Sequence, residues 1–359
     1  SWLTDHIAVN LQGSVVTDPD DDQQFRADGS YIGVNVGNFM ISAGFMERWW
    51  GPGWDGNLIL STNARPIPSI TVERNYTDPF KSKLLSWLGT WRASIAMGEM
   101  ESEDVAVPNV LFYAARINFK PRPWFEFGLT RTAQWCGGER PCDWETFSDM
   151  LLGRDNQVEG GESSEDQPGN QMAGYDLRVR SPWKALPLAV YGQMIGEDEA
   201  GSLPSKFIGL FGIETWGSSS FGGWRLRAEY AGTACNFARE APEYNCAYRN
   251  SIYPQGYSYR GRTIGHAMDN DSVIFSLAGI LTRPGGDTFS LTVRRVELNR
   301  DGGPHPISEV PLDLDNVELR YSRMFGAGKV VFGVGYDGRS PDPATGSDVR
   351  GYVTWQQGI

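Results

Sequence analysis

Residues 110–120 have the sequence VLFYAARINFK, in which apolar and polar side chains alternate. Successive side chains of an extended chain point to opposite faces. One face here carries Leu111, Tyr113, Ala115, Ile117 and Phe119, and the other carries Arg116, Asn118 and Lys120. A period of two with one apolar face predicts a β-strand.

The same alternation recurs along the chain. Further examples are GYDLRVRS (174–181), GGWRLRAEY (222–230), TFSLTVRRVEL (288–298) and NVELRYS (316–322). In each segment the face opposite the apolar one is polar or charged. The alternation changes phase at Arg294 and Arg295, which predicts a β-bulge there.

Connection lengths distinguish a membrane barrel from a soluble sandwich, because both show alternation. We expect about sixteen strands, near 5–17, 29–36, 38–46, 67–75, 90–101, 110–120, 123–135, 171–181, 186–197, 205–216, 223–233, 270–283, 286–299, 312–324, 328–338 and 347–357. Short turns and long polar loops alternate between them, as in outer-membrane barrels whose turns face the periplasm. The sequence predicts an all-β fold, a single transmembrane antiparallel β-barrel domain over 1–359 with both termini periplasmic.

Aromatic residues support this orientation, because they lie beside the short turns, where an interfacial girdle is expected. They are Phe119, Trp124, Phe125, Trp183, Trp216, Phe221, Trp224 and Phe325. Two short helices interrupt the pattern of strands. PFKSKLLSWLG (79–89) predicts an amphipathic helix in place of a short turn, and DWETFSDMLLG (143–153) predicts a helix in a long loop.

Composition excludes several classes of protein. The formal net charge is -12, so phosphate groups would be repelled, which argues against nucleic acid or an anionic membrane surface as a partner. The sequence contains no run of roughly 18 apolar residues, so it predicts no membrane-spanning helix. No signal peptide begins at Ser1; we expect either that it has been removed or that the sequence starts inside the mature protein.

The four cysteines form two local pairs, Cys136 with Cys142 and Cys235 with Cys246. Their even number and close spacing predict two disulfides in long extracellular loops, and hence export through an oxidising compartment. Free thiols are the alternative. Zinc fits less well, because neither pair has Cys-x-x-Cys spacing and the three histidines supply no ligand pattern.

One loop is compositionally unusual. The sequence ERWWGPGWDGNLILSTNARP (47–66) places three tryptophans, three glycines and a proline within eight positions. The predicted topology puts this loop at the extracellular end. Indole faces there could stack on sugar rings. An equally favoured interpretation is that the loop folds inward and its tryptophans fill the barrel mouth.

The longer stretch GFMERWWGPGWDGNLILSTNARPIPSITVERNY (44–76) resembles the signature of the capsule assembly Wzi family. The resemblance implies an outer-membrane β-barrel that acts as a lectin and retains capsular polysaccharide or exopolysaccharide at the cell surface. It also implies eighteen strands and a leading periplasmic helical segment. We expect this chain to lack that segment and to have between sixteen and eighteen strands; it ends in TWQQGI rather than in the terminal aromatic usual in such barrels.

The predicted polysaccharide site lies in residues 47–65. Its residues are Trp49, Trp50 and Trp54 as stacking faces, Arg48 and Arg65 as donors, and Glu47 and Asn63 as orienting partners. We expect the barrel interior to be lined by Arg116, Glu126, Asp176, Arg178, Arg180, Arg225, Arg227, Glu229, Arg294, Glu318 and Arg320. These residues would form either a polar conduit for an oligosaccharide or, the favoured interpretation, a ladder of ion pairs that closes the interior.

The other function classes have weaker support. A serine elbow, a metal motif and a phosphate loop are all missing from the sequence, so we expect no enzyme, no cofactor and no metal. Two suitably spaced carboxylates would suffice for a glycosidase, and the acidic run Asp18, Asp20, Asp21 and Asp22 could bind calcium. The expected partners are extracellular polysaccharide, outer-membrane lipid and lipopolysaccharide. A channel for oligosaccharides or other anionic solutes is the main alternative.

Overall fold

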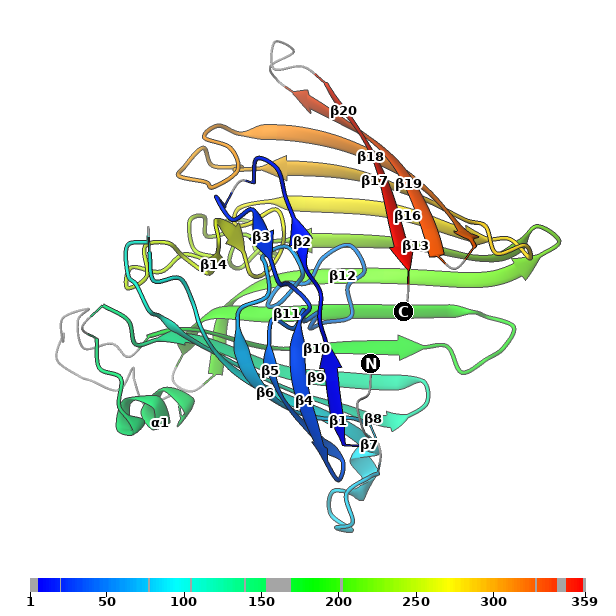
Figure 1. Ribbon diagram of the computed structural model, residues 1–359. Coiled ribbons are helices and arrows are strands. Elements are labelled where there is room, and N and C mark those ends of the chain that lie inside the picture. Colours follow the sequence, from blue (N-terminus) through cyan, green and yellow to red (C-terminus); the bar gives the residue numbers. More distant parts are fainter. Residues whose placement is uncertain are drawn as a thin grey trace.

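The computed structural model describes residues 6–19, 21–76, 78–103, 105–138, 140–152, 169–200, 203–326, 328–340 and 347–357. Sixteen strands form one antiparallel sheet in which each strand pairs with the next in chain order. Figure 1 shows this sheet curling around the inner loops. The strands are β1 (Ile7–Asn10), β4 (Tyr31–Val36), β5 (Phe39–Gly44), β6 (Ser69–Arg74), β7 (Thr90–Glu99), β8 (Leu111–Arg122), β9 (Phe125–Trp135), β10 (Gly169–Arg180), β11 (Leu188–Ala200), β12 (Leu203–Ser219), β13 (Gly222–Gly232), β16 (Val273–Thr282), β17 (Thr288–Leu298), β18 (Leu312–Phe325), β19 (Gly328–Ser340) and β20 (Asp348–Gln357).

The predicted all-β antiparallel fold and its sixteen strands are confirmed. Short turns gather at one end of the sheet, which we name the turn end, and long loops gather at the other, the loop end (Figure 1). β1 begins beside the β4–β5 turn and β20 ends beside the β18–β19 turn. Both strands therefore begin or end at the turn end, as predicted.

The strands carry apolar residues on the outer face and polar residues on the inner face. On β17, for example, Phe289, Leu291 and Val293 are exposed. Buried polar residues occupy the inner face of neighbouring strands, among them Ser276 on β16 and Asn316 on β18. A soluble sheet would bury the apolar face, so this inverted arrangement is that of a barrel surrounded by lipid.

Four local predictions have mixed outcomes. The helix in the 135–170 loop is confirmed as α1 (Trp144–Leu152), and both disulfides, Cys136–Cys142 and Cys235–Cys246, are present. The bulge at Arg294 and Arg295 is wrong, because both residues pair in continuous register with β16 and β18. A register shift occurs instead between Phe119 and Arg122, where two prolines flank the β8–β9 turn.

Two segments are less regular than predicted. The 79–89 helix is only the single 3-10 turn η1 (Ser86–Leu88). The first predicted strand, 5–17, is divided: β1 joins the large sheet, while β2 (Ser14–Val15) pairs with β3 (Phe25–Arg26) in a separate hairpin. A second small hairpin pairs β14 (Ser258–Tyr259) with β15 (Arg262–Thr263). Within the described part of the chain, no helix is long and apolar enough to cross a membrane.

Candidate functional site

The inner segment, which we define as residues 45–68 between β5 and β6, enters the barrel interior. Trp50 is 6% exposed, and Leu58 and Ile59 are 0% exposed. Its glycines allow close packing: a Cβ at Gly51 would lie 2.1 Å from Asn57 Oδ1, and one at Gly56 would lie 2.4 Å from His266 Nε2. Trp50 therefore belongs to the interior core, whereas Trp49 and Trp54 keep 40% and 39% of their surfaces exposed.

The tip of the inner segment, residues 53–58, is held by one carboxylate of the wall. Glu229 on β13 accepts hydrogen bonds from the backbone N–H groups of Trp54 (2.8 Å), Asp55 (3.1 Å) and Gly56 (3.3 Å). The Tyr191 hydroxyl donates a fourth hydrogen bond at 2.9 Å. A buried carboxylate with four donors is well satisfied, so Glu229 fixes the tip to the wall.

Two further wall residues hold the same tip. Gln193 on β11 accepts a hydrogen bond from Leu58 N at 2.7 Å and donates one to Trp50 O at 2.9 Å. Arg294 on β17 donates to the Asp55 carboxylate at 2.6 to 3.0 Å. Three strands thus contact one loop tip.

The loop 233–272 between β13 and β16 packs on the inner segment. The Tyr248 hydroxyl donates to Leu58 O at 2.6 Å, and the Tyr257 hydroxyl donates to Ile59 O at 2.8 Å. Ser61 N donates to Ile264 O at 3.0 Å. The two loops bury an apolar core inside the barrel.

The predicted interior residues lie on the wall, and most of them pair with each other or with the inner segment. Arg116 and Asp176 form an ion pair at 2.7 Å, and Arg178 pairs with Glu214. Arg320 lies 2.8 Å from Glu318. The first two pairs each join two strands of the wall, whereas Arg320 and Glu318 lie on the same strand, β18.

The remaining predicted interior residues make other contacts. The guanidinium of Arg180 lies 4.8 Å from the Trp216 ring. Those of Arg225 and Arg227 lie 5.1 and 5.0 Å from the Trp54 ring. Glu126 accepts a hydrogen bond from the Tyr76 hydroxyl at 3.1 Å and lies 3.9 Å from Lys120 Nζ.

Arg48 and Trp49 make contacts within the barrel. Arg48 donates to Ser69 Oγ at 2.7 Å and to Thr71 Oγ1 at 2.5 Å, so it ties the inner segment to β6. The Trp49 indole N–H donates to Gly53 O at 2.8 Å, and Trp49 keeps 40% of its surface exposed.

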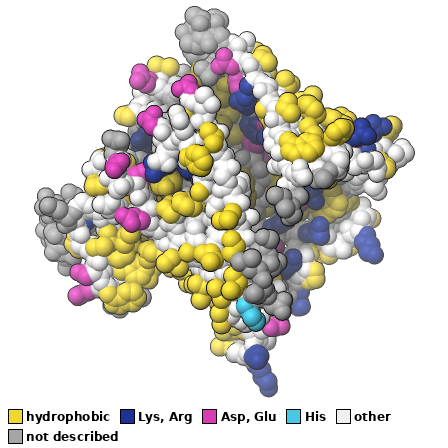
Figure 2. Space-filling view, in the orientation of Figure 1, with side chains coloured by type: hydrophobic (Ala, Val, Ile, Leu, Met, Phe, Trp, Pro, Cys, Tyr) yellow, Lys and Arg dark blue, Asp and Glu magenta, His cyan; other side chains and the backbone are white. Residues whose placement is uncertain are grey.

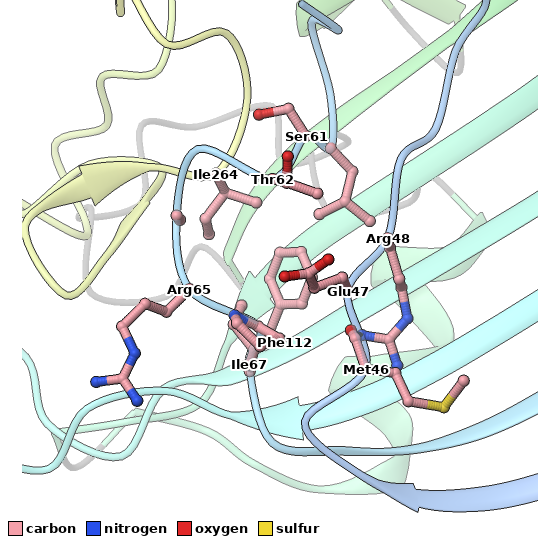
Figure 3. Close-up of a pocket in the computed structure, with 12 residues that line it drawn as sticks. Met46, Glu47, Arg48, Ser61, Thr62, Arg65, Ile67, Phe112 and Ile264 are labelled. Atoms are coloured by element: carbon pink, nitrogen blue, oxygen red, sulfur yellow. Dashed lines mark hydrogen bonds between the residues drawn. The ribbon is translucent and has the colours of Figure 1, made fainter. Parts of the chain in front are cut away.

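Figure 3 shows the small cavity beside Arg48, which Glu47, Phe112 and Ile264 also line. Its volume of about 30 Å³ corresponds to a water molecule. A sugar ring cannot enter this cavity.

Arg65 belongs to an ionic network at the loop end. It donates to Asp28 at 3.0 and 2.9 Å and to Asp21 at 2.8 Å, and Asp21 also accepts a hydrogen bond from Arg26 at 2.9 Å. Burial acts to raise the pKa of Asp21, but the hydrogen bonds from Arg65, Gln23 N and Arg26 outweigh it and lower that pKa below its usual value. Asp21 is therefore ionised at neutral pH.

Beside this network lies a larger polar pocket, which we name the mouth pocket. It has a volume of about 280 Å³ and is lined by Asp21, Arg26, Asp28, Glu47, Thr62, Asn63, Ala64, Arg65, Pro66, Arg260 and Arg262. The Asn63 side-chain amide donates to Thr263 O at 2.9 Å and so fixes that wall. In Figure 3, Glu47 and Arg65 come from opposite ends of the inner segment.

The structure brings together Glu47, Asn63 and Arg65 in the mouth pocket but leaves Trp50 and Trp54 elsewhere. Trp50 is buried, so its ring is part of the interior core and offers no open stacking face. Sequence reasoning missed Arg260 and Arg262, which the β14–β15 hairpin brings from about 200 residues away. The paired arginines around Gly261 were the available signal.

Some mouth-pocket groups have no ionic partner. Among the described residues, no ion pair is formed by Glu47 or by the Arg260 guanidinium, which lies 5.7 Å from the Tyr259 ring. No group of three or more His, Cys, Asp or Glu side chains within the described ranges is arranged to hold a metal ion. In the acidic run proposed for calcium, Asp21 faces arginines, and Asp20 lies outside the described residues.

An apolar exterior, a polar inner wall packed with inward-folded loops and a turn-to-loop asymmetry define an outer-membrane β-barrel with an occluded interior. The family model described as "Capsule assembly protein Wzi" matches residues 2–339. This chain belongs to the capsule assembly Wzi family, and it is an outer-membrane protein, as the resemblance implied.

Among the known proteins that are similar to the chain, two are informative. One is the solved structure of Wzi from Escherichia coli, an outer membrane protein involved in group 1 capsule assembly and a carbohydrate-binding β-barrel; it has a TM-score of 0.82 and 27% identity and covers 97% of this chain and 74% of its own. The other is an uncharacterized 55.8 kDa protein of the cps region of Klebsiella pneumoniae, 33% identical over 231 residues. That match covers 63% of this chain and 44% of the Klebsiella protein, so the chain spans less than half of that relative's length.

Proposed function

We propose that this chain is a non-catalytic, carbohydrate-binding outer-membrane barrel that holds capsular polysaccharide or exopolysaccharide at the cell surface through the mouth pocket. The observation that carries the proposal is the likeness of the whole barrel to E. coli Wzi, a carbohydrate-binding barrel. The mouth pocket supports it further, because polar groups converge there at the loop end.

The mouth pocket supplies hydrogen-bonding groups of both kinds. Glu47 accepts hydrogen bonds from sugar hydroxyls, while Arg260 and Arg262 donate to hydroxyl or carboxylate oxygens. Arg65 and Asn63 shape the pocket through their bonds to Asp28 and Thr263. Trp49 and Trp54 keep 40% and 39% of their surfaces exposed but do not line this pocket. A long polymer multiplies such weak contacts over many protein copies, so attachment persists despite a low affinity for each repeat.

The two alternatives have less support. A channel for oligosaccharides would require the inner segment to leave the interior, against its bonds to Glu229, Gln193 and Arg294. A glycosidase would need a protonated carboxyl group with a raised pKa. In the mouth pocket, Asp21 has a lowered pKa and is bonded to two arginines.

The apolar outer face would contact outer-membrane lipid, and the outer rim of the loop end would contact lipopolysaccharide. These partners follow from the placement of such barrels in the outer membrane.

Purified protein and polysaccharide extracted from the source cells provide the direct test. We expect the polymer to bind saturably without release of reducing ends, and the reconstituted protein to give no steady current in a planar bilayer. Release of oligosaccharides would indicate a hydrolase, large steady currents would indicate a channel, and failure to bind the polymer would contradict the proposal.

A further inference from the structure

Charge is divided between the two ends of the barrel. In Figure 2, Lys and Arg side chains gather toward the turn end, whereas Asp and Glu side chains gather toward the loop end. Exposed cationic residues at or beside the turns include Lys81, Lys83, Arg122, Lys184, Arg283 and Arg323. Exposed acidic residues of the loop end include Glu103, Asp143, Glu145, Glu240, Asp301 and Glu309. The turn end is thus locally basic in a chain whose net charge is -12.

Large exposed aromatic residues accompany these cations. Trp87 is 66% exposed, Trp183 69% and Phe325 69%, and Trp124 and Phe221 are also exposed. In three turns the cation and the indole are near neighbours in sequence, as with Lys184 beside Trp183. We name the six cations and five aromatic residues the turn-end collar.

Most cations of the collar have no acidic partner. Among the described residues, Arg323 pairs with Asp287 at 3.5 Å, and the other five cations form no ion pair. Their charges are therefore available to a ligand. Acidic residues at or beside these turns include Asp78, Glu126 and Asp287, and Glu126 lies 3.9 Å from Lys120 Nζ.

The 79–89 segment is held against the wall and presents Trp87 outward. Phe80 stacks on Trp91 with ring centroids 4.9 Å apart, and the Arg74 guanidinium lies 3.8 Å from the Trp91 ring. A Cβ at Gly89 would lie 2.1 Å from Lys120 O, so the segment approaches β8 closely. This packing fixes the position of the segment that carries Lys81 and Lys83.

We propose that the turn-end collar binds the phosphate groups of anionic glycerophospholipids in the periplasmic leaflet of the outer membrane. Indole rings settle at the interface between acyl chains and headgroups, and this places the neighbouring cations at the level of the lipid phosphates. A lipid with a net negative charge binds more favourably beside these cations, whereas a zwitterionic lipid obtains a smaller electrostatic contribution to its binding free energy. The inference rests on the outer-membrane placement of the barrel and is independent of polysaccharide binding.

Native mass spectrometry of the full chain tests the proposal. The protein would be equilibrated in micelles that hold equimolar phosphatidylglycerol and phosphatidylethanolamine with identical acyl chains, and the retained lipids counted. One cation near an anionic surface favours binding by about fivefold. We expect the wild-type protein to retain phosphatidylglycerol at least fivefold over phosphatidylethanolamine in 50 mM ammonium acetate and to lose most of that preference in 0.5 M, because salt screens exposed charges.

Two matched triple variants locate the effect. The collar variant removes three charges from the collar, by Lys81→Gln, Lys83→Gln and Lys184→Gln. The loop-end variant removes three charges from the loop end, by Lys206→Gln, Arg239→Gln and Arg300→Gln. We expect the collar variant to retain the two lipids nearly equally and the loop-end variant to match wild type. Equal retention by the wild-type protein, or a preference unchanged in the folded collar variant, would overturn the proposal. Should the collar variant fail to fold, the salt series on wild type still decides.

Polysaccharide retention by cells that express the collar variant separates this inference from the proposed function. We expect the folded collar variant to retain normal amounts of polymer while losing its lipid preference. Loss of both from a folded barrel would contradict the independence of the two sites.

Discussion

The tip of the inner segment and the mouth pocket differ in how their polar groups are satisfied. At the tip of the inner segment, the Asp55 carboxylate is bonded to Arg294 and three successive N–H groups are bonded to Glu229. At the mouth pocket, Glu47 and the Arg260 guanidinium have no ionic partner among the described residues. Both parts are rich in charged residues, yet only the mouth pocket leaves charges available to a ligand.

The difference shows how structural and ligand-binding residues can be told apart in a filled barrel. A buried polar group without a partner destabilises the fold, so a folding role predicts that such groups are mostly bonded. At the tip, Asn57 Nδ2 is the exception that we find among the described residues. Groups kept for a ligand stay unpaired and near solvent until the ligand arrives. Changes at the tip should therefore alter stability, and changes at Glu47 or Arg260 should alter binding alone.

The largest effect is expected from Asp55→Ala at the tip. This change leaves the Arg294 guanidinium without its main partner, and breaking one half of a buried ion pair costs about 3 to 5 kcal/mol. Unfolding in urea, followed by loss of heat-modifiable migration on a gel, measures it. Asp55→Asn, which keeps some hydrogen bonding, should lose less. A variant Asp55→Ala that is as stable as wild type would show that the contacts of the tip do not hold the inner segment in the barrel.

A second prediction concerns pH and His266, which packs against Gly56 of the tip. Burial lowers the pKa of His266 to about 4, against an ordinary value of about 6.5. As pH falls from about 6.5 to 4, the unfolded chain binds a proton that the folded chain does not, so the free energy of unfolding decreases, by roughly 3 kcal/mol at most. Urea unfolding at pH 7 and pH 4.5 should show this decrease in wild type and a smaller one in His266→Gln. The same decrease in both proteins would assign it to other groups.

Arg65→Ala tests the network between the two regions and should have an intermediate effect. It removes hydrogen bonds to Asp21 and Asp28, with an expected loss of about 2 kcal/mol at pH 7. Because the folded-state pKa of Asp21 is lowered, its contribution is fully present above the unfolded pKa of about 3.9 and is lost as pH falls through the lowered folded-state pKa. The difference in stability between wild type and variant should therefore shrink steadily as the pH is lowered below about 3.9. A difference that does not shrink in acid would mean that Arg65 acts through packing.

The barrel wall could be predicted from the sequence because its signals are local. A period of two within each strand, the lengths of the connections and the short spacing of each cysteine pair lie within a few residues of one another. The first strand and the 79–89 segment were predicted less well, because prolines, glycines and a short exposed apolar run leave local structure ambiguous.

The contacts of the inner segment were beyond sequence reasoning for a physical reason. Asp55 and Arg294 are 239 residues apart, and Trp54 and Glu229 are 175 apart. Neither pair has a local pattern in the sequence. Any arginine of the barrel interior could have been the partner of Asp55, and any carboxylate there could have been the partner of the Trp54 N–H group. The sequence therefore left two interpretations of the tryptophan cluster open, and it could not place Arg260 beside Glu47.

Retention of polysaccharide on cells tests the central claim, that the mouth pocket binds the polymer, most directly. Cells that lack the native protein would express wild type, Glu47→Gln with Arg260→Ala, or the control Arg239→Ala, with folding checked by heat-modifiable migration. Loss of a hydrogen bond to a charged group costs about 1.5 kcal/mol, or roughly tenfold in affinity. We predict that the folded double variant releases most of its polysaccharide into the medium while the control retains it. A folded double variant that keeps a wild-type amount of cell-bound polysaccharide would contradict the account.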